Sequence, residues 1–346
     1  MRIGVIPEAA REWLTLRGHR FPQPLFDVMG TMLLSRAVMA GVHFGVFNRL
    51  ARGAKTADEL AAETRSDKHG MKLLLDALVA CRYLTRENGR YRNATLGARW
   101  LVCEAPQTLA NFVRFNYDQW EWVSHLEQYI QHGAAQDIHV KLNASQWRNY
   151  MLGLKDIATL SAAELVSKIK WAPPPRRLLD VGGGHSYYSI AMCRRYPGLQ
   201  ASVVDLEPAV RIGRELVAQA GLSPRISFRA GSLTETAFGE HHDIAFLFNV
   251  MHHLDEETNR ETLRRLHAAL GPQGRLVVWE SFREEREKMQ KDQLGSLLAL
   301  FFGVTSKQQT YAFDQVAEWT RQAGFKRLQH QKLRSAPHAG LLLATK

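Results

Sequence analysis

Residues 178–185 read LLDVGGGH, and this stretch decides the fold. The short apolar run that ends at Val181 predicts a buried strand, because such a run directly before a turn signal is typical of one. Glycine has no Cβ, so the backbone of residues 182–184 can turn tightly and pass close to a ligand. The residues that follow have a helical pattern. The stretch therefore predicts a strand, a glycine turn and a helix.

A second carboxylate follows the next strand-like run, residues 201–204. Asp205 lies twenty-three residues after Gly182. In a Rossmann-like sheet, a carboxylate in this position accepts hydrogen bonds from ribose hydroxyls. A glycine turn that only connects strand to helix would leave Asp205 unexplained. The glycine turn and Asp205 together predict a nucleoside site.

The rest of the C-terminal half repeats the alternation of strands and helices. Further strand-like runs cover residues 226–228, 244–248, 276–279 and 341–344, with helical segments between several of them. This order favours a mostly parallel sheet that is covered by helices on both faces. The pattern changes at the proline triplet 173–175, so we predict an α/β domain over residues 173–346.

The N-terminal half has a helical pattern that ends in a hairpin signal. Residues 25–50 are apolar with small residues interspersed, Thr56 and Glu59 have the spacing of a capping box, and residues 68–80 have one apolar face. Asn88-Gly89 between two short strand-like runs is a strong hairpin signal. Helix, helix and hairpin predict a winged helix within residues 1–105, followed by a helical connector over residues 106–172.

Composition narrows the class of protein. The 346 residues carry a formal net charge of +11, but the basic residues are scattered and no run of five like charges occurs. Three cysteines without metal-ligand spacing favour a reduced intracellular protein. The N-terminus lacks a signal-peptide core, and the longest uncharged apolar stretch, residues 294–306, is too short to span a bilayer. We expect a soluble cytoplasmic protein that binds neither membrane nor nucleic acid.

A family resemblance covers nearly the whole chain, and five segments after the helical N-terminal half carry it. They are RRLLDVGGG (176–184), VVDLEPAV (203–210), NVMHHLDEETNRETLRRLHAALGPQGRLVVWES (249–281), VAEWTRQAGF (316–325) and GLLLATK (340–346). With the helical N-terminal half, the chain resembles class I S-adenosylmethionine (AdoMet) methyltransferases, and among them the small-molecule O-methyltransferases with a winged-helix dimerisation domain. This resemblance implies a Rossmann-like, seven-stranded, mostly parallel sheet, a homodimer, AdoMet as cofactor and no metal.

The resemblance also implies functional residues. It assigns general-base catalysis to His252 and the orientation of that histidine to Glu280. The residues implied to bind AdoMet are Asp180, Gly182, Gly184, Asp205, Ser232, Leu233, Phe248 and Asn249, and those implied to face the acceptor are Trp147, Tyr150, Met151, Phe301 and Phe302. Three positions depart from the family. Ser186 replaces a motif glycine, Ser232 replaces an aspartate that reaches the adenine, and Gln308 replaces a carboxylate near the histidine.

The chemistry of His252 leaves alternatives open. Histidine suits the removal of a proton from a phenolic hydroxyl at neutral pH. The segment NVMHHL also occurs in methyltransferases that act by proximity alone, in which case His252 would be a wall of the site. His253 is interpreted as structural, and His241-His242 as a solvated loop. C-methylation, another AdoMet-dependent reaction and a nucleic-acid-binding winged helix remain as alternative functions.

Overall fold

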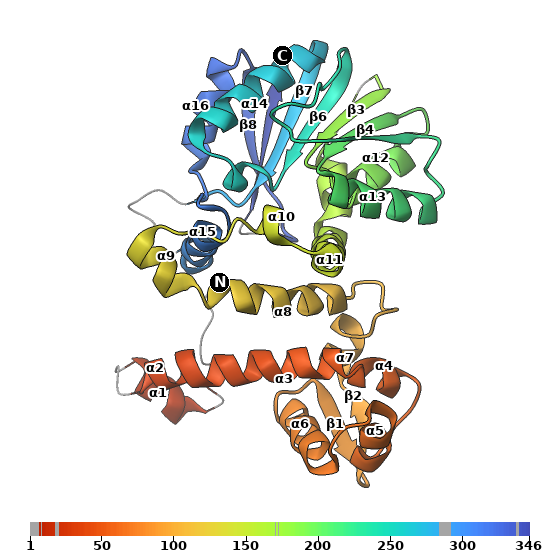
Figure 1. Cartoon of the computed structure of the whole chain (residues 1–346), viewed down its shortest axis with the longest axis vertical. Helices are drawn as coiled ribbons and strands as arrows, with labels where there is room; N and C mark the ends of the chain where they lie inside the picture. Colours follow the sequence, from red (N-terminus) through yellow and green to blue (C-terminus); the bar gives the residue numbers. More distant parts are fainter. Residues whose placement is uncertain are drawn as a thin grey trace. The chain divides into compact units, whose positions relative to one another are not determined.

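The computed structural model describes residues 7, 9–17, 21–169, 171, 173–283, 292–336 and 339–346. The chain divides into two units, Met1–Tyr117 and Asp118–Lys346. Figure 1 shows the first as mainly helical and the second as a sheet with helices on both faces.

The first unit contains the predicted winged helix. Helices α5 and α6 lead into the antiparallel hairpin β1–β2, with Leu84 paired to Asn93. Asn88 and Gly89 both have positive φ, +48° and +76°, as the two-residue hairpin turn requires. The elements are α1 (Ala10–Arg17), α2 (Gln23–Leu25), η1 (Phe26–Gly30), α3 (Thr31–His43), α4 (Val46–Ala51), α5 (Ala57–Thr64), α6 (Lys68–Ala80), β1 (Leu84–Glu87), β2 (Arg90–Asn93), α7 (Thr95–Trp100) and the start of α8 (Ala110–Val123).

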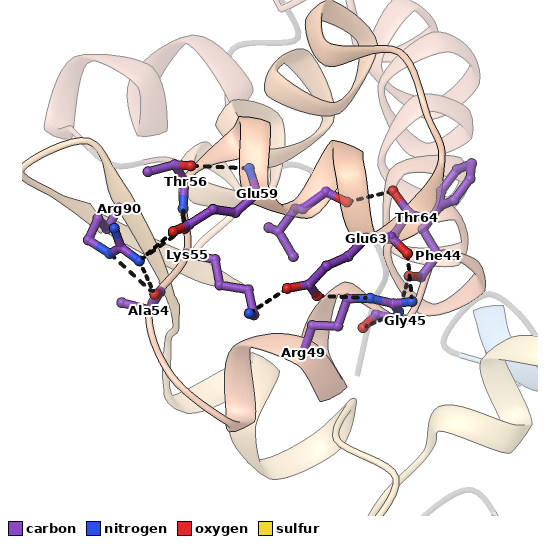
Figure 2. A network of polar contacts seen from close by, with 11 residues as sticks. Phe44, Gly45, Arg49, Ala54, Lys55, Thr56, Glu59, Glu63, Thr64 and Arg90 are labelled. Atoms are coloured by element: carbon purple, nitrogen blue, oxygen red, sulfur yellow. Dashed lines mark hydrogen bonds and ion pairs between the residues drawn. The ribbon is translucent and has the colours of Figure 1, made fainter.

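A polar network joins the start of α5 to the hairpin (Figure 2). The predicted capping box is present: Glu59 N donates to Thr56 Oγ1 at 3.2 Å, and Thr56 N donates to Glu59 Oε2 at 2.6 Å. Arg90 of β2 donates to both Glu59 oxygens and to the carbonyl of Ala54. The cap of α5 therefore also anchors the hairpin.

Replacing Thr56 with alanine is expected to lower the free energy of unfolding of this unit by about 1 kcal/mol. The Glu59 N–H loses its acceptor, while Thr56→Ser keeps the hydroxyl and should stay close to wild type. Urea denaturation followed by far-ultraviolet circular dichroism measures both. Equal stability of the alanine and serine variants would show that the cap contributes nothing.

The second unit is built on one seven-stranded sheet of order β5-β4-β3-β6-β7-β9-β8. The first five strands in this order are parallel, and β9 runs antiparallel to both β7 and β8. The predicted fold class is confirmed. The strands are β3 (Arg177–Val181), β4 (Gln200–Asp205), β5 (Ile226–Ala230), β6 (His242–Phe248), β7 (Leu270–Glu280), β8 (Lys326–Lys332) and β9 (Gly340–Thr345).

Helices cover both faces of this sheet (Figure 1). Alternate strand residues enter opposite cores, so that Leu178 packs in one and Leu179 in the other. Helices α11 and α12 contribute to the first core, and α14 and α16 to the second. The helices of the unit are α9 (Leu126–His132), α10 (Ile138–Lys141), α11 (Ala144–Lys168), α12 (Tyr187–Arg195), α13 (Glu207–Gln219), η2 (Met251–His253), α14 (Glu256–Ala269), α15 (Gln293–Ser306) and α16 (Phe313–Gln322).

Two expectations about local structure were wrong or incomplete. His242 does not lie in a solvated loop: it begins β6, is 3% exposed, and its Nε2 is 2.9 Å from the carbonyl oxygen of Phe238. Its neighbour His241 is exposed, as expected. Strand β8 was not predicted, because its sequence KRLQHQK is polar and mostly exposed at the sheet edge.

The order of the strands locates the ligand-binding edge. The chain moves from β3 outward to β4 and β5, and then crosses back to β6 on the other side of β3. In open α/β sheets, ligands bind at the carboxyl ends of the strands beside such a switch point. Val181, Asp205 and Phe248 end β3, β4 and β6, so the residues around them form the candidate site.

Candidate active site

The glycine loop after β3 holds backbone where side chains have no room. Gly182 has φ +72°, and a Cβ there would lie 2.2 Å from Val250 Cγ2. A Cβ at Gly184 would lie 2.8 Å from Met151 Sδ and 3.0 Å from Asp205 Oδ2. The loop thus passes close to its neighbours: the positive φ of Gly182 favours glycine, and a Cβ at Gly184 would require Met151 or Asp205 to shift.

Asp205 is bonded directly to this loop. Its Oδ2 accepts from Gly184 N and its Oδ1 from Leu206 N, both at 2.7 Å. Burial raises the pKa of Asp205 to about 6, although both backbone bonds act in the opposite direction. Each carboxylate oxygen can accept more than one hydrogen bond, so Asp205 retains acceptor capacity. The Asp205 carboxylate has no proton to donate and lies beside a loop that a ligand can approach closely. It therefore suits the hydroxyls of a ribose, which donate hydrogen bonds.

Asp180 lies beneath the loop. The side chain is 2% exposed and accepts a 2.6 Å hydrogen bond from Ser189 Oγ, and a Cβ at Gly183 would meet its carboxylate at 2.5–2.8 Å. Burial, and secondarily the charge of Asp205, raises the pKa of Asp180 to about 7. In this geometry Asp180 supports the loop from below.

The family's motif glycine is replaced by Ser186 at a position with positive φ. Ser186 has φ +56° and is fully buried at the start of α12. Glycine adopts this conformation without steric cost, whereas serine does so only under strain. The replacement keeps the backbone path of the turn, so the loop still leads into the helix.

The four other residues implied to bind AdoMet lie at the ends of β5 and β6. The Ser232 hydroxyl is bonded within its own turn, 2.7 Å from Thr234 Oγ1, and Leu233 is partly buried. Arg265 of α14 donates to the carbonyls of Leu233 and Thr236, which fixes this turn. No sequence pattern singled out Arg265.

The end of β6 offers a different mixture of groups. The Phe248 side chain points into the core, where it stacks on Phe246 with centroids 4.3 Å apart. Only its main chain is therefore left for a ligand. Asn249 is exposed, has φ +53°, and donates its N–H to the Trp279 carbonyl at 2.8 Å.

His252 and Glu280 form a buried hydrogen-bonded pair. His252 Nδ1 lies 2.7 Å from Glu280 Oε1, and the residues are 5% and 1% exposed. Ser281 N also donates to Glu280 Oε1, at 2.9 Å. A carboxylate only accepts, so Nδ1 donates in this bond, and in a neutral imidazole Nε2 then carries the lone pair. Within the described part of the chain, no residue hydrogen-bonds to Nε2.

An aromatic ring packs directly on the histidine of this pair, and further apolar side chains lie at the same edge of the sheet. Phe302 of α15 stacks on the His252 ring, with centroids 3.8 Å apart and planes at 21°, and Phe301 lies edge-on to Phe302 at 5.7 Å. Trp147, Tyr150 and Met151 of α11 are all buried, and Met151 lies against Gly184. Gln308 follows α15, and no described hydrogen bond joins it to His252.

A histidine that the sequence did not single out also belongs to this neighbourhood. His139 of α10 lies 3.3 Å from Tyr150 Oη through its Nε2, and its ring packs edge-on to His253 at 4.6 Å. His253 in turn lies 4.2 Å from the His252 ring. A lone histidine carries no spacing signal, so sequence reasoning could not find it. Among the described residues, no cluster of three or more potential ligands has metal-binding geometry.

The comparisons with known proteins agree with this architecture. Residues 108–326 match the model of the O-methyltransferase domain, and residues 26–103 match the O-methyltransferase dimerisation domain. A 3-hydroxy-5-methyl-1-naphthoate 3-O-methyltransferase of Streptomyces sahachiroi is 26% identical, over 94% of this chain and 95% of that protein. The N,N-dimethyltransferase OxyT of Streptomyces rimosus is 26% identical, over 71% and 74%.

A solved structure with the same fold spans the whole chain. Human N-acetylserotonin methyltransferase in complex with AdoMet has a TM-score of 0.82 at 21% identity, covering 99% of each chain. The domain match covers more than half of the sequence, and the dimerisation domain precedes it. The chain therefore belongs to the family of AdoMet-dependent O-methyltransferases that carry an N-terminal dimerisation domain.

Proposed function

We propose that this chain transfers a methyl group from AdoMet to a hydroxyl of a small aromatic molecule, with His252 as the general base. The observation that carries this proposal is the 2.7 Å bond between His252 Nδ1 and Glu280 Oε1. It fixes the tautomer in which Nε2 can accept a proton. The experiment that tests the base is the replacement of His252, described in the Discussion.

The proposed cofactor site uses the loop after β3. When bound, AdoMet supplies a methyl group on a positively charged sulfur, which an acceptor oxygen displaces in line. Gly182 and Gly184 allow close approach to the backbone, and Asp205 accepts hydrogen bonds from the ribose hydroxyls. Asp180 supports the loop. Ser232, Leu233, the main chain of Phe248 and Asn249 complete the site at the neighbouring strand ends.

The proposed base chemistry follows from the ordinary pKa of a phenol, about 10. At neutral pH the hydroxyl is protonated and is a weak nucleophile, so proton removal accelerates its attack. His252 Nε2 takes this proton, and the carboxylate of Glu280 stabilises the resulting imidazolium through Nδ1–H. The proposed acceptor surface consists of Trp147, Tyr150, Met151, Phe301 and Phe302, whose rings and thioether suit a flat molecule.

Glu280→Gln is expected to lower the turnover number by roughly tenfold. The amide oxygen can still accept from His252 Nδ1, so the ring keeps its orientation, but a neutral amide no longer stabilises an imidazolium. The loss should be smaller than that caused by removal of His252. Turnover of a hydroxynaphthoate acceptor measures it, and an unchanged rate would contradict the proposed role of the carboxylate.

Methyl transfer to nitrogen is the second candidate reaction. It is favoured by the similarity to OxyT, whose name describes N,N-dimethylation. A neutral amine already has a nucleophilic lone pair, so this reaction would depend less on His252. Incubation with AdoMet and an aminonaphthol, which offers both a hydroxyl and an amine, separates the two reactions by the atom that carries the methyl group.

We also propose that the first unit forms a homodimer. Residues 23–43 form a helical stretch that is long and apolar enough to cross a membrane by length and composition, and only 17% of its most apolar window is buried within the chain. Val28 and Leu33 are 69% and 57% exposed. The match of residues 26–103 to a dimerisation domain favours a second copy of this chain as the partner that covers them.

Val28→Glu combined with Leu33→Glu is expected to convert the dimer into a monomer, because two buried charges would lie in the apolar interface. Leu73→Glu is the matched control: it is 55% exposed on α6, outside the stretch, and should remain dimeric. Light scattering after gel filtration measures the mass. A monomeric wild type, or recruitment of the wild type to phospholipid vesicles in place of dimerisation, would overturn this proposal.

We assign residues 1–105 to dimerisation, residues 106–172 to a connector that contributes to acceptor binding, and residues 173–346 to AdoMet binding and catalysis. The three cysteines are present as free thiols, which supports a reducing, cytoplasmic location.

A further inference from the structure

His139 has no role in the proposed reaction, yet it lies among the residues that surround the base. It comes from the short helix α10, whereas Tyr150 belongs to α11 and His253 to η2. Its Nε2 is 3.3 Å from Tyr150 Oη, and its ring lies 4.6 Å from His253 and 5.9 Å from Trp147. Three separate elements therefore bring these polar rings together.

Packing alone does not account for a histidine in this place. His139 is half-buried, so its imidazole loses part of its hydration, and an apolar ring of the same size would fill the space without that cost. Burial lowers the pKa of His139 to about 4, and burial together with the two neighbouring histidines lowers the pKa of His253 well below its ordinary value. Both rings are therefore neutral at pH 7, and neither acts as a fixed charge.

A neutral imidazole has two nitrogens with different roles. One bonds with Tyr150 Oη, and within the described part of the chain no residue hydrogen-bonds to the other, Nδ1 of His139. In either tautomer this nitrogen can bind a hydroxyl group, since a hydroxyl both donates and accepts. In the tautomer with a proton on Nδ1 it can also bind a carbonyl oxygen.

The position of this nitrogen relative to the base limits the ligand. The His253 ring separates His139 from His252, at 4.6 Å and 4.2 Å. An oxygen adjacent to the reacting hydroxyl would lie only about 2.7 Å away from it, one hydrogen-bond length. The geometry favours a second oxygen on the far side of the ring system.

We propose that His139, held by Tyr150, binds a second hydroxyl or carbonyl oxygen of the acceptor, placed across a fused aromatic ring system from the hydroxyl that is methylated. This inference rests on the proposed function, because it needs the reacting hydroxyl at His252. It makes His139 a specificity-determining residue and the preferred acceptor a dioxygenated aromatic.

The test compares 2-naphthol with 2,7-dihydroxynaphthalene, which has its second hydroxyl on the far ring, and with 2,3-dihydroxynaphthalene, in which it is adjacent. Calorimetry measures binding of each to the enzyme saturated with S-adenosylhomocysteine. The wild type is expected to bind the 2,7-diol roughly tenfold more tightly than 2-naphthol, beyond the factor of two from its two equivalent hydroxyls. The 2,3-diol should gain little.

His139→Phe should abolish this preference and leave binding of 2-naphthol unchanged. Tyr150→Phe, which keeps the ring but removes the hydroxyl that holds His139, should reduce it. His132→Phe, on the exposed surface of α9, is the matched control and should behave as wild type. Equal wild-type binding of 2-naphthol and the 2,7-diol, or an equal loss for both ligands in His139→Phe, would overturn the inference.

The binding measurement tests the role of His139 independently of the proposed methyl transfer. Binding is measured without turnover, so a preference for the 2,7-diol that depends on His139 supports the subsite whatever reaction follows. Absence of methyl transfer to an acceptor that binds would instead contradict the proposed O-methylation.

Discussion

His252→Ala is expected to lower the turnover number by roughly 10²–10⁴, while the affinity for AdoMet stays within about threefold of wild type. The variant loses the nitrogen that accepts the phenolic proton, but the cofactor loop and Asp205 keep their hydrogen bonds. Steady-state turnover of a phenolic acceptor at neutral pH measures the loss.

The control for this experiment is His241→Ala, which removes an exposed imidazole outside the site and should leave the rate unchanged. Calorimetry of AdoMet binding checks that His252→Ala retains an intact cofactor site. A proximity-only enzyme behaves differently, since its turnover does not need the imidazole of His252. Retention of more than about a third of wild-type turnover on a phenol of ordinary pKa would contradict the general-base proposal, and alignment would then carry catalysis.

Asp205→Ala should weaken AdoMet binding by roughly tenfold or more, corresponding to about 1.5–3 kcal/mol for a hydrogen bond to a charged group. The variant loses the proposed acceptor of the ribose hydroxyls and also the bond that holds Gly184 N. Asp205→Asn keeps one oxygen for that N–H and should lose less. Calorimetry with AdoMet and with S-adenosylhomocysteine measures both variants.

The pH dependence of this affinity has a defined sign. Burial raises the pKa of Asp205 to about 6. Below that pH the carboxyl is protonated and is a weaker acceptor, so AdoMet affinity should fall as the pH decreases from 7.5 to 5. Asp205→Asn should lose the slope near pH 6, while a slope near pH 7 would report Asp180. Unchanged affinity in Asp205→Ala would show that this carboxylate does not bind the cofactor.

Most of the fold could be predicted from sequence, because its elements are encoded locally. The apolar runs before the glycine turn and before Asp205 became β3 and β4, and Asn88-Gly89 formed the hairpin turn. Elements that depend on residues far away in the sequence were harder to predict. Strand β8 is polar because it lies at the sheet edge, and His242 looked solvated although its ring bonds to the carbonyl of Phe238.

The residues of the candidate site also divide into those that could be predicted from sequence and those that could not. The glycine turn and the spacing to Asp205 predicted a nucleoside site, and the family resemblance implied the pair of His252 and Glu280; in the structure both pairs are hydrogen-bonded at the carboxyl edge of the sheet. Side-chain direction was not predictable. Phe248 points into the core and Asp180 lies beneath the loop, although both end or nearly end their strands. His139 joins the site only through tertiary contacts.

The most direct test of the account is to identify the atom that receives the methyl group. The enzyme is incubated with 1,3-dihydroxynaphthalene and with AdoMet that carries ¹³C in its methyl group. In this acceptor the two hydroxyls and the ring carbon between them are all nucleophilic. Nuclear magnetic resonance locates the label, and mass analysis quantifies S-adenosylhomocysteine. We predict label on oxygen, one equivalent of S-adenosylhomocysteine per methyl ether, and loss of both in His252→Ala. Label on the ring carbon, or S-adenosylhomocysteine formed without a methylated product, would contradict O-methylation by a general base.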